Sequence, residues 1–191
     1  MSLFDDELVR SVRDGAAWEV HRAHRDPASG PALDEVGVLA LSSFQLARTG
    51  EVVVAVRGIT AYSDGLLLSV VVLFADEQKT EDLGWSMQEF GRSPGRFRFG
   101  CAFTDGRSAT TGTRDAPAVS LPDLPALTLL GSHATALGWD GDYWLHPLPP
   151  LGSLVLGCRW PDRAIPETLV EIDSDPLVAA ALTSGPVWRT S

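Results

Sequence analysis

The chain has 191 residues, of which 45% are hydrophobic, and its formal net charge is −10 at pH 7. This length is typical of a single domain that buries a core large enough to fold without a disulfide or a metal. Nucleic-acid binding relies on Lys and Arg to neutralise phosphates, so the acidic balance argues against nucleic-acid partners and against anionic membrane surfaces.

Near the N-terminus, residues 2–13 favour a short helix. Phe4, Leu8 and Val12 recur at a helical spacing and form one apolar stripe. The polar stretch that follows reads as a linker up to Pro31. The stripe is therefore a candidate interaction arm, which docks either on its own domain or on another protein.

The same end of the chain bears on location. A secretory signal peptide needs a positively charged start and an apolar core, whereas Asp5 and Asp6 lie near the start here. The longest apolar stretch, residues 66–75, is far too short to span a bilayer. We therefore expect a cytoplasmic protein without membrane insertion, whose cysteines stay reduced.

Residues 50–74 are predicted to form a β-hairpin around which the domain is organised. A β-branched run over residues 52–56 is followed by turn residues at 63–65 and by a second apolar run to Phe74. Both strands are too apolar to leave one face in water. We therefore place them in the middle of a sheet, beneath another layer.

Further strands are predicted on both sides of this hairpin. One covers residues 36–47, and the later ones cover residues 97–104, 126–132, 143–146, 153–160 and 166–173. Residues 139–142 and 108–124 read as a turn and a long loop. Asp175 and Pro176 are typical of a helix start, which predicts a helix over residues 175–184.

These elements predict a mostly β fold, an antiparallel β-sandwich of about seven to nine strands with short N- and C-terminal helices. The absence of alternating strands and helices argues against a parallel sheet. Residues 1–31 are assigned to the helical arm and its linker, and residues 32–191 to the sandwich domain.

Several short stretches of the chain are familiar as a set. They are residues 46–49 (LART), 61–65 (AYSDG), 142–144 (DYW) with 147–150 (PLPP), 160–161 (WP) and 165–168 (IPET). Together they resemble a group of uncharacterised proteins from high-GC bacteria, over roughly residues 36–188. The resemblance implies a shared fold, and it brings no activity and no catalytic residue.

The motifs of the common catalytic classes are missing from the sequence or lie in the wrong context. The phosphate-binding pattern G-x-x-x-x-G-K-[ST] does not occur. The hydrolase pattern G-x-S-x-G occurs once, at residues 91–95 (GRSPG), but a predicted strand follows it where the hydrolase elbow needs a helix. Ser132 and His133 are adjacent and would point to opposite faces of a strand, so they cannot pair as nucleophile and base. His21 and His24 could share a metal on a helix, but two ligands without a third are more simply linker residues in solvent. We therefore predict no catalytic residue, no metal and no cofactor.

Cys101 and Cys158 both fall on the apolar face of an alternating strand. Facing strands of a sandwich could bring them into a disulfide, as in immunoglobulin domains. The Trp that such domains place shortly after the first Cys is missing, which favours two buried free thiols.

The residues around Trp139 and Trp144 are the sharpest ligand-site candidate. An exposed Trp144 beside Asp140 and Asp142 would resemble a platform that stacks on a sugar or a peptide. The simpler alternative is that neighbouring loops cover Trp144. The two carboxylates could also bind Ca²⁺, although the other ligands of a calcium loop are not spaced here.

Two functional hypotheses follow from these observations. The first is a non-catalytic β-sandwich that acts by binding another protein or by self-association. The alternative is a small-ligand or carbohydrate-binding sandwich that uses Trp139, Asp140, Asp142 and Trp144.

Overall fold

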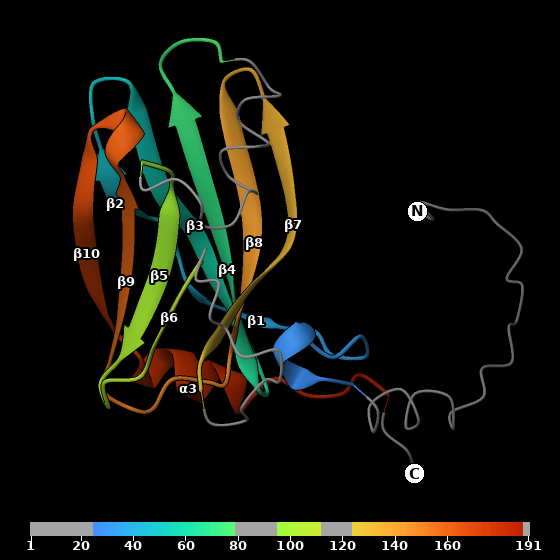
Figure 1. Cartoon of the computed structure of the whole chain (residues 1–191). Helices are drawn as coiled ribbons and strands as arrows, with labels where there is room; N and C mark the ends of the chain where they lie inside the picture. The colour runs from blue at the N-terminus through green and yellow to red at the C-terminus, as the bar shows by residue number, and fades with distance from the viewer. Residues whose placement is uncertain (1–24, 79–94, 112–123, 189–191) are drawn as a thin grey trace, which may run out of the picture.

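A computed structural model describes residues 25–78, 95–111 and 124–188 of the chain. In these ranges ten strands form two antiparallel sheets that stack face to face (Figure 1). The predicted antiparallel β-sandwich is confirmed. The predicted N-terminal helix and its stripe of Phe4, Leu8 and Val12 lie outside the described residues.

The larger sheet has the strand order β1-β3-β4-β8-β7, and β2 also pairs with β3. Its strands are β1 (Val38–Leu41), β2 (Phe44–Arg48), β3 (Val52–Tyr62), β4 (Gly65–Phe74), β7 (Ala126–Thr135) and β8 (Gly138–His146). The smaller sheet has the order β10-β9-β5-β6. Its strands are β5 (Arg98–Phe103), β6 (Ser108–Thr110), β9 (Ser153–Trp160) and β10 (Ile165–Asp173).

Three short helical segments complete the described chain. They are the 3-10 helices η1 (Pro27–Ser29) and η2 (Pro161–Arg163) and the α-helix α3 (Asp175–Ala181). Figure 1 shows α3 lying across one end of the sandwich. Leu177 and Ala181 on α3 are buried in the core, so the helix closes this end of the apolar interior. No helix of the described part is long and apolar enough to cross a bilayer.

The predicted central hairpin is confirmed as β3 and β4, which pair with each other in the middle of the larger sheet. Their inward side chains, Val54 and Val70 among them, are fully buried. Their outward side chains are half-buried or exposed, and Leu73 is an example. The prediction that a second layer lies over the hairpin therefore holds for its inner face.

Aromatic side chains fill much of the space between the sheets. Phe99 from β5 packs against Tyr143 from β8 with ring centroids 5.1 Å apart, and Phe97 packs edge-on against Trp160 at 5.4 Å. Rings of this size bury large apolar areas and dominate the energetics of a small core. The contact between Phe99 and Tyr143 joins β5 and β8, which belong to different sheets.

Four predicted boundaries are corrected by the structure. Residues 36–47 form two strands, β1 and β2, which both pair with β3. Residues 139–142 lie inside β8, and the turn that precedes this strand falls at residues 136–137. Residues 108–110 form β6 in place of the start of a loop, and α3 ends at Ala181.

Candidate functional site

The structure separates the four residues that were predicted to form an aromatic and acidic ligand site. Trp139 faces the core between the sheets and is 1% exposed, whereas Trp144 faces the opposite side of β8 and is 0% exposed. Neither indole can stack on a ligand at the surface, so the predicted platform is not formed. The alternative interpretation, that a neighbouring segment covers Trp144, is confirmed.

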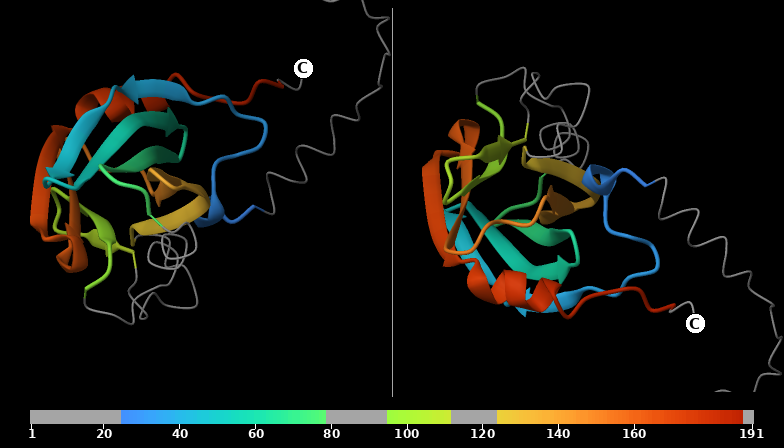
Figure 2. Two further views of the ribbon diagram at one scale, coloured as in Figure 1. Left: turned by 90° about the horizontal axis from the view of Figure 1, so that it is seen from above. Right: turned by 90° about the horizontal axis from the view of Figure 1, so that it is seen from below.

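Trp144 is covered by the segment around η1, which lies against β7 and β8 (Figure 2). The Trp144 Nε1–H donates a 2.8 Å hydrogen bond to the Pro27 carbonyl, and the Thr128 hydroxyl donates to the Ala28 carbonyl at 3.2 Å. Arg25 forms an ion pair with Asp64 beside this contact. The predicted linker therefore ends too late, because residues 25–30 pack as part of the domain.

Asp140 and Asp142 lie on the outer face of the larger sheet. Asp142 accepts a 2.7 Å hydrogen bond from the Ser69 hydroxyl, and Asp140 lies 3.9 Å from both Arg57 and His133. Three neighbouring strands thus supply partners to these carboxylates. Within the described ranges no group of three or more His, Cys, Asp or Glu side chains could hold a metal ion. The structure therefore adds no support to the suggestion that Asp140 and Asp142 bind Ca²⁺.

Cys101 and Cys158 lie on adjacent strands of the smaller sheet, and both are buried and free. Cys101 is paired with Leu156 and Cys158 with Phe99, so the two cysteines are diagonal neighbours on one sheet. The immunoglobulin-like disulfide requires one cysteine in each sheet. Burial raises the pKa of Cys101 to about 12 and that of Cys158 to about 11.

We expect neither cysteine to react with Ellman's reagent in the native protein at pH 8, because the thiolate is the reactive form and burial keeps both thiols protonated. A thiol in the unfolded chain has a pKa of 9.0, below the pKa that it has when buried. The free energy of unfolding is therefore predicted to fall as the pH rises from 9.0 toward about 12. Alkylation under denaturing, non-reducing conditions should modify both cysteines, as seen by mass spectrometry. An intramolecular disulfide, or rapid labelling of the native protein, would contradict this prediction.

An exposed apolar surface forms where the start and the end of the described domain meet. Glu35 and Pro186 form an isolated antiparallel bridge, and the Val187 amide donates a 2.8 Å hydrogen bond to the Asp34 carbonyl. Large apolar side chains on these two segments point into solvent. We call them the terminal surface: Leu33, Val36, Leu182 and Val187.

The terminal surface could not be predicted from local sequence. Leu182 is the residue that caps the C-terminal end of α3, directly after the buried Ala181, and its side chain is exposed there. Leu33 and Val36 lie 149 and 146 residues before Leu182 in the numbering of the chain. Only the tertiary bridge brings the two segments together.

No family model, curated protein or solved structure matches the chain. Functional inference therefore depends on the surfaces themselves, and the resemblance to a group of bacterial proteins stays a prediction.

Proposed function

We propose that this protein is a non-catalytic β-sandwich that acts through protein–protein contact, and that the terminal surface binds a second copy of the chain. The exposure of the terminal surface is the observation that carries the proposal. Leu33 is 71% exposed, Val36 67%, Leu182 82% and Val187 55%. Soluble monomers rarely leave several large apolar side chains together in water, and such patches commonly mark interaction sites.

The terminal surface is held in a defined shape. In addition to the bridge between Glu35 and Pro186, the Ser184 hydroxyl donates a 3.1 Å hydrogen bond to the Val36 carbonyl. A surface that is ordered before binding loses less conformational entropy when the partner arrives. The four defining side chains are also uncharged, and the two acidic side chains between Leu33 and Val36, Asp34 and Glu35, are buried.

The energetics support a weak symmetric dimer. Burying one such side chain contributes up to about 1.5 to 3 kcal/mol, and a two-fold contact between identical surfaces uses each residue twice. Association costs about 4 to 15 kcal/mol in lost translational and rotational freedom. Four such side chains on each of two copies can offset that cost, so we expect a concentration-dependent dimer.

Two further parts of the proposal concern the arm and the location. The stripe of Phe4, Leu8 and Val12 is supported as a second contact by its helical spacing alone. A cytoplasmic location is proposed on the sequence pattern alone, since the longest apolar stretch, residues 66–75, is too short to span a bilayer.

We expect Leu182→Glu and Val187→Glu to shift the protein from dimer to monomer, because each variant places a charge in a contact that buries apolar surface. Multi-angle light scattering coupled to size exclusion, over a hundredfold range of protein concentration, measures this shift. Leu151→Glu is the matched control, since the exposure of Leu151 lies between those of Leu182 and Val187 and the residue is outside the terminal surface. A wild type that stays monomeric throughout, or a Leu151→Glu variant that dissociates as readily, would refute the proposal.

A further inference from the structure

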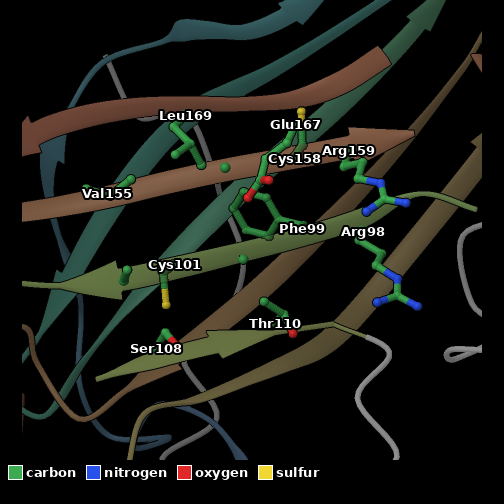
Figure 3. A pocket seen from close by; sticks show the side chains of 13 residues that line it. Arg98, Phe99, Cys101, Ser108, Thr110, Val155, Cys158, Arg159, Glu167 and Leu169 are labelled. Carbon is green, nitrogen blue, oxygen red and sulfur yellow. The ribbon is translucent and has the colours of Figure 1, made fainter. Parts of the chain in front are cut away.

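The outer face of the smaller sheet carries a groove of about 520 Å³ that is separate from the terminal surface (Figure 3). All four strands of this sheet contribute to it. The pairing of β5 with β9 places its residues in cross-strand rows: Arg98 opposite Arg159, Gly100 opposite Gly157, and Ala102 opposite Val155. Along the strands, the groove therefore begins at the two arginines, continues over the two glycines, and ends at the apolar residues Ala102 and Val155.

The charged end is formed by Arg98 and Arg159. Figure 3 shows their guanidinium groups side by side at one end of the groove. Like charges directly opposite one another on a sheet face are destabilising. Within the described ranges neither guanidinium forms an ion pair, although the chain has 25 acidic residues against 15 basic ones. The fold itself therefore gives no reason for this pairing, whereas an anion lying between the two groups would stabilise it.

The floor of the groove carries no side chains of its own because Gly100 and Gly157 lie side by side. A Cβ atom on Gly100 would come within 2.7 Å of Thr110 Cγ2, and a Cβ atom on Gly157 within 2.5 Å of Leu169 Cδ2. The side chains of Thr110 on β6 and Leu169 on β10 therefore lie close over the glycines and form the two side walls of the groove. Side chains at the two glycines would collide with these walls, so the walls can lie there only because both positions are glycine.

We propose that this groove binds a small amphipathic anion, with a singly charged carboxylate between Arg98 and Arg159 and an apolar chain along the glycine floor. The planar fork of arginine matches the geometry of a carboxylate. Apolar contacts for the chain come from Val155 and Leu169. Glu167 also lines the groove, and with the net charge of −10 it raises the cost of a doubly charged head group.

Sodium octanoate is the probe for this site, used with ¹⁵N-labelled full-length protein. We expect saturable shifts of the Gly100 and Gly157 amide signals, since these glycines form the floor. Sodium acetate carries the charge without the chain, and 1-octanol carries the chain without the charge, so both should bind at least about tenfold more weakly. Shifts that do not saturate, or that miss both glycines, would overturn the proposal, and so would equal binding of acetate or octanol.

Arg159→Gln and Arg98→Gln are expected to weaken octanoate binding about tenfold or more, because each removes a charge-assisted hydrogen bond to the carboxylate. Neither should lower the melting temperature, since each also relieves a like-charge pair. The matched control is Arg57→Gln, on the outer face of the other sheet, and its octanoate affinity should equal that of the wild type. Unchanged affinity in both groove variants, or an equal loss in Arg57→Gln, would show that the arginine pair does not bind the carboxylate.

Discussion

Val54→Asp is expected to prevent folding. Val54 lies on β3 in the middle of the larger sheet, is fully buried, and is paired with Val72 of β4. An aspartate there would bury a charge that has no partner, at a cost of several kcal/mol. A domain of this size has a total stability of only about 5 to 15 kcal/mol. The soluble yield and the β signal in far-UV circular dichroism measure the effect.

Val53→Asp is the control for that substitution. Val53 is the adjacent residue on the same strand, but its side chain is half-buried on the outer face, opposite Leu73. Both variants replace a valine with an aspartate. If Val53→Asp folds and Val54→Asp does not, the loss of folding comes from burial on the inner face of β3 and not from the aspartate itself. If Val54→Asp stayed soluble and melted within a few degrees of the wild type, the central position of the hairpin in the core would be wrong.

The strands could be predicted from the sequence where alternation is strong. On β5, Phe99 and Cys101 alternate with Arg98 and Gly100, and the structure buries the first pair and leaves the second on the outer face. A period of two residues fixes which side chains share a face, because successive side chains on a strand point in opposite directions. On β8 the same rule overrides the turn signal of Asp140 and Gly141, since Trp139 and Tyr143 both face the core.

The candidate sites could not be predicted in the same way, because each depends on register between distant segments. Alternation along the strand puts Trp144 on the opposite face of β8 from Tyr143, yet the segment that covers it precedes it by 117 residues. Arg98 and Arg159 are unremarkable in separate strands and become a site only when β5 pairs with β9. Local pattern assigns a face, whereas tertiary contacts decide whether that face is open.

Trp144→Ala is expected to destabilise the fold by about 3 to 5 kcal/mol, the range for truncating a buried aromatic residue. Trp144 packs edge-on against Tyr62 at 5.6 Å and holds the η1 segment through its hydrogen bond to Pro27. For a chain of this length the expected fall in melting temperature is about 6 to 20 °C. Thermal unfolding followed by circular dichroism measures it, and Leu73→Ala is the control, because Leu73 is exposed on the same outer face.

A second readout tests whether Trp144 also anchors the segment that covers it. Arg25 is largely buried and ion-paired to Asp64, so we expect slow tryptic cleavage after Arg25 in the wild type and rapid cleavage in Trp144→Ala. Trp144→Phe keeps most of the apolar bulk but cannot donate to the Pro27 carbonyl, and should cost only about 0.5 to 1.5 kcal/mol. Cleavage after Arg25 that is equally fast in all three proteins would mean that residues 25–30 do not pack on β8. The apolar face around Trp144 would then be open, and the ligand platform predicted from the sequence would return as a hypothesis.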